Sequence, residues 1–258
     1  MAVSDDSPMA LPGPVRPPLL VAALAGSGCS GVQSTLDPAG PAAAAIAQTW
    51  WLMAIGAAVI FALVMGLLWH TLARRGDGRE FVHGTRVIVF GGLLLPSLTL
   101  IVLLVYGTAV GHRVVAVEPP ADLVVQVVGR QFHWDFHYLD GADGQPVAAT
   151  TDVLVLPRGR TVEFQVTSAD VIHSFWIPRL GGKIDAIPGR VNPLRLRVDR
   201  AGPITGQCAE FCGREHAHMR FDVLALPPAQ FERWLAEGGA QPPSRARAEL
   251  QALAEPLQ

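Results

Sequence analysis

One short stretch of the sequence gathers several side chains that bind metal ions. Within twelve residues it carries two cysteines, a histidine and a methionine, namely Cys208, Cys212, His216 and Met219, and His173 lies upstream. Thiolate, imidazole and thioether form the ligand set that selects copper for electron transfer, with methionine as the weak axial ligand. Because two thiolates can bridge two metal ions, the second cysteine favours a site for a pair of copper ions.

Three other interpretations of this stretch remain open. The two cysteines could form a disulfide, which a compartment outside the cytosol permits, but then His173, His216 and Met219 would have no role. The cysteines and histidines could hold zinc in a closed tetrahedral site, which needs no methionine. An ordinary buried loop fits least well, because charged residues are also present: Glu210, Arg214 and Glu215.

The stretch resembles the copper loop of cytochrome c oxidase subunit II, a family whose members carry a dinuclear copper A centre. The match reads Cys208-x-Glu210-x-Cys212-Gly213-x-x-His216-x-x-Met219. Residues 168–176 (SADVIHSFW) and 182–190 (GKIDAIPGR) also match. The resemblance extends from the apolar segments near the N-terminus to about residue 226. It is specific, since only copper-bearing members of the family keep both cysteines.

The resemblance implies six copper ligands: His173, Cys208, Glu210, Cys212, His216 and Met219. Glu210 would bind through its backbone carbonyl and the others through their side chains. The Glu210 carboxylate resembles one that faces a magnesium or manganese site shared with subunit I. Two bridging thiolates would spread the unpaired electron over both copper ions, so that little bond rearrangement accompanies its transfer. Hydrogen bonds and packing around the sulfurs would tune the reduction potential.

Residues 131–138 (QFHWDFHY) resemble the family's aromatic stretch that faces the copper site. Phe132 stands where most members have the tryptophan that receives the electron from cytochrome c, and Trp134 matches a neighbouring aromatic residue. We expect electrons to enter at these two residues, although the stretch could equally be a strand of packed rings. Three residues match the docking patch for the electron donor: Gln131, Asp170 and Asp185. Since His137 replaces a usual carboxylate, we expect a less basic or a tethered donor.

Two long apolar runs precede these motifs. Neither Trp50–Trp69 nor Val87–Val110 contains a charge, and the second run includes Gly91, Gly92 and Pro96, which membrane helices tolerate. Each run is long enough to cross a membrane, and tryptophans at the ends of the first suit an aromatic belt. A buried hairpin of a soluble protein is the alternative. The arginine-rich segment between the runs is predicted to be cytoplasmic, which places the chain after Val110 outside.

The N-terminal residues resemble an export signal. A short apolar run ends in small residues and Cys29, as at a signal cleavage point. Cys29 would then be lipidated, as in bacterial lipoproteins, although the tripeptide before it lacks the usual aliphatic start. The alternative is a disordered leader with an incidental free cysteine.

The remainder has the pattern of an all-β domain. Residues 161–167 and 194–198 alternate with a period of two, and 123–128, 152–156 and 221–226 are further strand candidates. With the late ligand loop, the pattern predicts an all-β cupredoxin-like sandwich preceded by a two-helix transmembrane hairpin. The predicted organisation is an export signal (1–29), an exported segment (30–45), a hairpin (46–112, helices at about 48–72 and 87–110), a cupredoxin-like copper A domain (113–237, ending in a helix over 229–237) and a mobile tail (238–258).

The resemblance implies subunit II of cytochrome c oxidase, which passes electrons from cytochrome c through copper A to the haems of subunit I. This supports oxygen reduction coupled to proton translocation. The implied partners are subunits I and III, cytochrome c and the bilayer of a bacterial inner membrane, with the copper domain on the periplasmic side. The net charge of −2 gives no sign of nucleic-acid binding. Alternatives are a relative with another donor, a quinol-oxidase subunit (whose relatives lack the cysteines), nitrous oxide reductase (which needs a large catalytic domain) and a copper chaperone.

Overall fold

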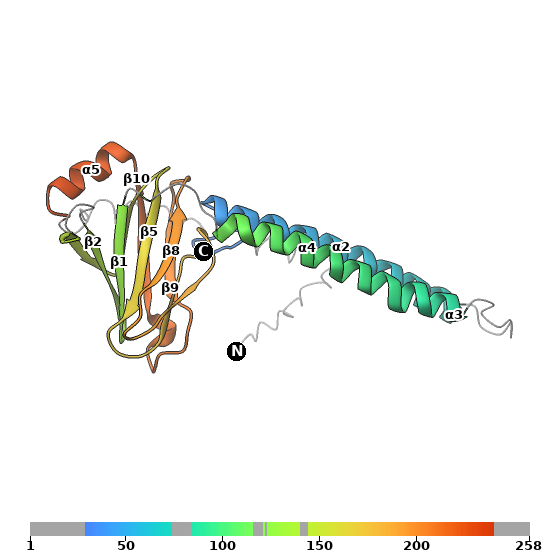
Figure 1. Cartoon of the computed structure of the whole chain (residues 1–258). Helices are drawn as coiled ribbons and strands as arrows, with labels where there is room; N and C mark the ends of the chain where they lie inside the picture. Colours follow the sequence, from blue (N-terminus) through green and yellow to red (C-terminus); the bar gives the residue numbers. More distant parts are fainter. Residues whose placement is uncertain (1–28, 74–83, 116–120, 122, 140–143, 240–258) are drawn as a thin grey trace, which may run out of the picture.

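The computed structural model describes residues 29–73, 84–115, 121, 123–139 and 144–239. The predicted export signal up to residue 28, the arginine-rich connection over 74–83 and most of the predicted tail lie outside these residues. A long helical hairpin extends from one side of a β-sandwich (Figure 1).

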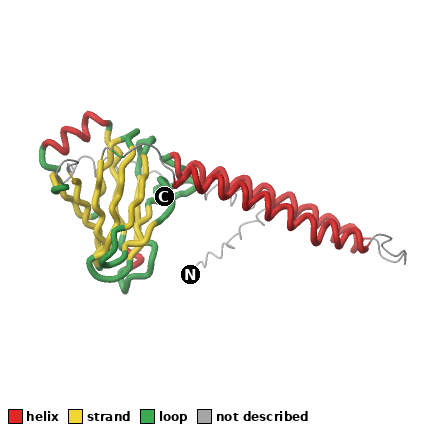
Figure 2. Tube along the Cα trace, viewed as in Figure 1, coloured by secondary structure: helices red, strands yellow, loops and turns green. Residues whose placement is uncertain are grey.

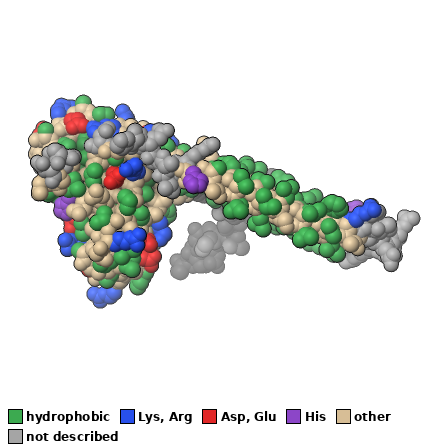
Figure 3. All heavy atoms as spheres, in the orientation of Figure 1, with side chains coloured by type: hydrophobic (Ala, Val, Ile, Leu, Met, Phe, Trp, Pro, Cys, Tyr) green, Lys and Arg blue, Asp and Glu red, His purple; other side chains and the backbone are tan. Residues whose placement is uncertain are grey.

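The hairpin has two long arms that lie side by side (Figures 1 and 2). The first arm is α2 (Pro41–Ala73). The second consists of α3 (Gly84–Val87), a π-helical segment η1 (Ile88–Leu94) and α4 (Leu95–Val115). Both arms are long and apolar enough to cross a membrane, and hydrophobic side chains cover most of their surface (Figure 3). At 1.5 Å per residue, α2 is about 50 Å long.

Both arms are longer than the sequence interpretation expected. Helix α2 begins at Pro41 rather than near residue 48, because proline suits the first helical turn and the alanines that follow it are buried. Hydropathy marks only the part of a helix that is apolar throughout, so it missed this first turn. The second arm continues to Val115. Gly91, Gly92 and Pro96 do not break it, because the wider π-helical turns directly before Pro96 accommodate the missing backbone N–H.

The sandwich consists of two five-stranded sheets. In order across the first sheet, the strands are β3 (Pro146–Thr151), β2 (His133–Leu139), β1 (Leu123–Arg130), β5 (Thr161–Ser168) and β8 (Asn192–Arg197). The second sheet contains β4 (Val153–Pro157), β10 (Arg220–Leu226), β9 (Ile204–Cys208), β6 (His173–Trp176) and β7 (Ile184–Ala186). The pairs β1–β5 and β4–β10 are parallel, and the other pairs are antiparallel.

Aromatic rings fill the core between the two sheets. Phe175 and Phe221 stack with centroids 5.2 Å apart, and Trp134 packs edge-on against both. At the edge of the core, Trp234 of helix α5 (Pro228–Ala236) lies against Tyr138, with 4.9 Å between ring centroids. The predicted order of two apolar helices followed by a β-sandwich is therefore confirmed. The aromatic core also packs against β6, since Trp134 contacts both His173 and Phe175 of that strand.

Candidate metal centre

The ends of two neighbouring strands bring the predicted ligands together. His173 is the first residue of β6 and Cys208 the last residue of β9. The two strands are antiparallel partners, with Phe175 opposite Cys208. The backbone N–H of Cys208 donates to the carbonyl of Met219 over 2.9 Å, which closes the ligand loop. Strand pairing thus places a histidine beside a loop that is distant in sequence.

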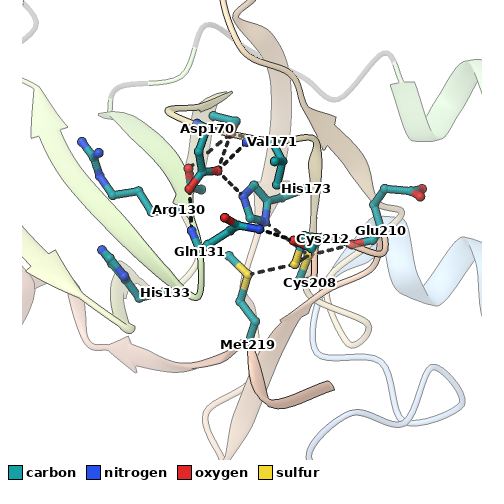
Figure 4. Close-up of polar contacts among 12 residues, drawn as sticks. Arg130, Gln131, His133, Asp170, Val171, His173, Cys208, Glu210, Cys212 and Met219 are labelled. Atoms are coloured by element: carbon teal, nitrogen blue, oxygen red, sulfur yellow. Dashed lines mark hydrogen bonds and ion pairs between the residues drawn. The ribbon is translucent and has the colours of Figure 1, made fainter. Parts of the chain in front are cut away.

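The donor atoms of all six predicted ligands lie within contact distance of one of the two cysteine sulfurs. Figure 4 labels five of these ligands: His173, Cys208, Glu210, Cys212 and Met219. The two Sγ atoms are 3.8 Å apart. Cys208 Sγ is 3.8 Å from Nδ1 of His173 and 3.2 Å from the carbonyl oxygen of Glu210. Cys212 Sγ is 3.6 Å from Nδ1 of His216 and 3.7 Å from Sδ of Met219. Each sulfur therefore has one imidazole nitrogen and one weaker donor beside it.

This arrangement has two similar halves that share a pair of sulfurs. Metal–ligand bonds of about 2.0–2.3 Å put neighbouring ligands roughly 3.5 Å apart in a tetrahedral site, which matches the separations here. Both thiols are free, so they do not form a disulfide. One zinc ion held by the cysteines and histidines would leave Met219 and the Glu210 carbonyl unused. The donor set therefore fits two soft metal ions with bridging thiolates better than one zinc ion.

The site is shielded from water on most sides. His173 is completely buried, and Cys208, Cys212 and Met219 are at most 5% exposed. His216 is only half-buried, so it forms the edge of the site that is nearest to solvent. The Glu210 carboxylate is exposed and points away from the sulfurs in Figure 4, whereas its carbonyl faces Cys208.

Asp170 fixes the orientation of the buried histidine ring. Its Oδ1 lies 2.8 Å from Nε2 of His173, and its other oxygen accepts a hydrogen bond of 2.7 Å from the backbone N–H of Gln131. When Nε2 carries the proton and donates to this carboxylate, the lone pair of Nδ1 faces the sulfurs. A carboxylate in this position is a common partner of a metal-binding histidine. The sequence interpretation had assigned Asp170 only to donor docking.

Hydrogen bonding shifts the pKa values of this pair in opposite directions. Partial burial opposes ionisation of Asp170, but hydrogen bonds from His173 and from two backbone N–H groups outweigh it and lower the pKa of the carboxyl. Burial also opposes the charged form of His173, yet hydrogen bonds with Cys208 and Asp170 raise the pKa of the imidazole. The Asp170–His173 pair is therefore held together by charge as well as by geometry.

The two thiols titrate as a pair. Burial opposes ionisation of Cys208, but hydrogen bonds with His173 and with the backbone lower its pKa to about 6. Burial and the neighbouring charge of Cys208 raise the pKa of Cys212. The lowered pKa of Cys208 favours its thiolate, whereas the raised pKa of Cys212 favours its protonated thiol. Metal binding at such a site releases protons.

Gln131 and Phe132 pack directly against the ligand loop. The side-chain amide of Gln131 donates to the carbonyl of Cys212 over 2.6 Å. Gly213 follows Cys212 with a φ of 136°, and a Cβ at this position would lie 2.9 Å from Cζ of Phe132. Glycine is therefore needed for both the backbone conformation and the close approach of the ring. The half-buried Phe132 lies between the surface and the loop.

Trp134 occupies a deeper position. It is completely buried, with its ring centroid 5.9 Å from that of His173. Its indole N–H has no hydrogen-bond partner among the described residues. Trp134 therefore has no exposed edge through which it could meet a partner protein, although it touches a predicted ligand.

An exposed apolar patch lies beside the ligand loop. Phe211, between two predicted ligands, is 76% exposed, and Val171 and Ile172 are exposed next to it. These residues, together with Asp185 and residues 210–213, line a pocket of about 560 Å³. Asp185 lies 3.6 Å from Nζ of Lys183, which partly neutralises its charge. The sequence interpretation missed Phe211, whose only signal was a bulky apolar residue in an otherwise polar loop.

A family model matches part of the chain, and two curated relatives match most of it. The family model described as cytochrome c oxidase subunit II, periplasmic domain, matches residues 142–226. The chain is 34% identical over 223 residues to cytochrome c oxidase subunit 2 of Alkalihalophilus pseudofirmus, which covers 81% of this chain and 64% of that protein. It is 30% identical over 292 residues to the probable cytochrome c oxidase subunit 2 of Streptomyces avermitilis, covering 91% of this chain and 90% of that protein.

A solved structure of the periplasmic domain of subunit II of cytochrome oxidase from Bradyrhizobium japonicum is 35% identical, with a TM-score of 0.41. The match covers 47% of this chain and 96% of that domain. The matches with the probable cytochrome c oxidase subunits 2 of Rickettsia bellii and Rickettsia felis are shorter. They cover 50% of the Rickettsia bellii protein and 42% of the Rickettsia felis protein. The match with the Streptomyces protein, however, extends over nearly the full length of both chains. The chain therefore belongs to the cytochrome c oxidase subunit II family.

Proposed function

We propose that the chain is the electron-accepting subunit of a haem-copper oxidase and binds two copper ions as a copper A centre. The proposed ligands are His173, Cys208, Glu210, Cys212, His216 and Met219. The observation that carries the proposal is the pair of sulfurs 3.8 Å apart, each with its own imidazole nitrogen and weaker donor. Family membership supports copper as the metal.

The chain's own residues would keep this site rigid and dry. A bound copper pair supplies a one-electron couple. Asp170 holds the His173 ring from behind, and Gln131 holds the loop through the carbonyl of Cys212. The buried sulfurs have little water around them. Because the two anchors come from short turns directly beside strands β1, β2 and β5, the ligands would need to move little when the charge of the centre changes.

Electrons would enter at Phe132 and arrive from cytochrome c. The half-buried ring of Phe132 lies against the ligand loop, whereas the buried Trp134 would act only as an inner neighbour of His173. The proposed docking carboxylates are already engaged, Asp170 by His173 and Asp185 by Lys183. Electrostatic steering of a basic donor would therefore be weak, which supports a less basic or tethered cytochrome, as the sequence also predicts.

The other partners follow from the apolar hairpin and from Glu210. We infer that both arms cross a bacterial inner membrane beside subunits I and III, with the sandwich on the periplasmic side. The exposed Glu210 carboxylate would face subunit I and contribute to a magnesium or manganese site there. Electrons would pass to the haems of subunit I, where oxygen reduction is coupled to proton translocation. Cys29, which is exposed at the start of the described chain, would carry a lipid anchor.

The test is electron delivery by the assembled complex. The full-length chain is produced with its haem-copper subunit, and oxidation of reduced cytochrome c is followed together with haem reduction. Cys208→Ser and Cys212→Ser should each abolish electron delivery, because oxygen is a poor substitute for a bridging thiolate. Cys29→Ser, which lies outside the site, is the matched control and should retain delivery in detergent. Full turnover in both copper-loop variants would contradict the proposal.

A further inference from the structure

The segment before helix α2 is attached to the sandwich along its length. The backbone N–H of Thr205, in β9, donates to the carbonyl of Val32 over 3.2 Å. Further along, the N–H of Ala39 donates to the carbonyl of Arg179 over 2.7 Å, and the N–H of Asp199 donates to the carbonyl of Ala39 over 2.8 Å. Backbone hydrogen bonds therefore join this segment to the domain at both of its ends.

A buried arginine holds this segment in place. Arg179 is only 5% exposed. Its guanidinium donates to the carboxylate of Asp37 over 2.8 Å, to the backbone carbonyl of Asp37 over 2.8 Å and to the carbonyl of Pro203 over 2.8 Å. Arg200 adds a second ion pair to Asp37 over 3.0 Å. Because a buried charge is costly without partners, Arg179 depends on Asp37 for its stability in this position.

The same contacts join the domain to the first turn of α2. The N–H of Ala43 donates to the carbonyl of Leu180 over 3.1 Å. The domain thus satisfies an N–H group that a helix N-terminus leaves unpaired. Gly40 lies so close to the carbonyl of Arg197 that a Cβ would clash with it, and Ala42 and Ala43 are buried. Small residues let the helix start directly on the sandwich, which fixes the direction of its axis.

Some attachment points lie on or near the strands that carry metal ligands. Gln207, next to Cys208 in β9, accepts a hydrogen bond of 3.1 Å from the side chain of Gln33. Arg179 lies in the turn that follows β6, whose first residue is His173. A tilt of α2 against the sandwich would therefore break contacts on β9 and in the turn after β6.

We propose that residues 32–43 form a rigid joint that holds the copper centre at a fixed position on the membrane hairpin. Arg179 is its positioning residue: it acts on electron transfer to the next acceptor through Asp37 and α2, without touching the centre. The proposal rests on the proposed function for the electron-transfer consequence, whereas the joint itself is a property of the folded chain. Electron transfer slows as the distance between donor and acceptor grows, so a copper centre that moves away from its acceptor would deliver electrons more slowly.

The first test does not depend on copper. Hydrogen exchange of the full-length chain in detergent should show protected amides at Ala39 and Ala43. Arg179→Met should speed their exchange by at least about 100-fold, because it leaves Asp37 without its buried partner. Arg179→Lys, which keeps the charge but loses the paired N–H groups, should restore part of the protection. Arg195→Met removes a surface ion pair with Glu163 and is the matched control, with unchanged exchange.

The second test follows electrons in the assembled oxidase. In Arg179→Met, the copper spectrum and the rate of copper reduction by the donor should be unchanged, while electron transfer from copper to haem should slow. Gly40→Val alters only the joint and should give the same result if the arginine variant does not fold. The proposed joint would be contradicted if the amides of Ala39 and Ala43 exchanged freely in the wild type. It would also be contradicted if haem were reduced at a rate within twofold of wild type in both variants. Protected amides in a chain that binds no copper would instead contradict the proposed function alone.

Discussion

Replacing Asp170 with asparagine removes the carboxylate behind the proposed copper ligand His173. Oδ1 of Asp170 accepts hydrogen bonds from Nε2 of His173 over 2.8 Å and from the backbone N–H of Val171 over 2.6 Å, and Oδ2 accepts one of 2.7 Å from the backbone N–H of Gln131. Asparagine has a single acceptor oxygen, so its NH₂ group must face the donors at one of these two positions. Either the histidine ring loses its anchor, or Gln131 loses its backbone partner beside the ligand loop.

The expected loss follows from these two contacts. Loss of such an outer partner of a metal-binding histidine typically lowers metal affinity by about 10–100-fold, which corresponds to roughly 1.4–2.7 kcal/mol. The metal-free protein should also lose about 1–3 kcal/mol of unfolding free energy, since a buried donor is left unsatisfied. The losses of copper affinity and of stability should appear together, because the Asp170 carboxylate bonds both to His173 and to the backbone of Gln131.

The assay is a copper titration of the metal-free, full-length chain in detergent against a competing chelator. Asp185→Asn is the matched control: it removes the same charge beside the ligand loop, but its partner is the half-exposed Lys183. Its copper affinity should stay within about threefold of wild type, as expected for a surface pair. If Asp170→Asn bound copper as tightly as Asp185→Asn and only slowed reaction with the donor, Asp170 would be a docking residue and the reasoning would be wrong.

Three further experiments, with five substitutions between them, test individual parts of the site and the core. Cys212→Ser should abolish the shared centre, whereas Met219→Leu should keep copper and shift its reduction potential; spectra and redox titration distinguish them, and the reverse order would contradict the ligand roles. Phe132→Ala should slow copper reduction by the donor in stopped flow with an unchanged copper spectrum, and Phe132→Trp should not; an unaffected alanine variant would exclude this route. Gly206→Ala should lower the unfolding free energy by about 1–3 kcal/mol, because a Cβ would clash with the Phe221 ring; unchanged denaturant unfolding would refute this.

The local part of the metal site could be predicted from the sequence because its ligands share one short loop. Cys208, Cys212, His216 and Met219 lie within twelve residues, so their chemistry is visible without a fold. His173 is 35 residues from Cys208 and could be assigned only through the family resemblance. The pairing of β6 with β9 explains how it arrives there.

The strands were predicted where side chains alternate clearly. The interpretation found β5 almost completely, and its burial alternates along its whole length. It missed β6 and β7, which are four and three residues long, too short to establish a period. It also missed β9, whose sequence ITGQC contains a glycine and a glutamine and resembles a loop. These missed strands carry or adjoin two of the metal ligands.

Individual hydrogen bonds between distant residues could not be predicted. Arg179 and Asp37 are 142 residues apart, and nothing in either local sequence marks them as partners. The family resemblance implied that residues 131–138 face the copper site, but not that Gln131 bonds to Cys212, which is 81 residues away. Such contacts depend on how the sheets and the N-terminal segment pack, and they decide how firmly the site is held.

The central claim is that the two cysteines share a pair of copper ions. The direct measurement is metal analysis combined with electron spin resonance of the full-length chain after copper loading. The account predicts about two copper ions per chain and, after partial reduction, one unpaired electron spread equally over two copper nuclei. A single copper ion per chain with a one-nucleus signal, or a chain filled with zinc and without a copper signal, would contradict it.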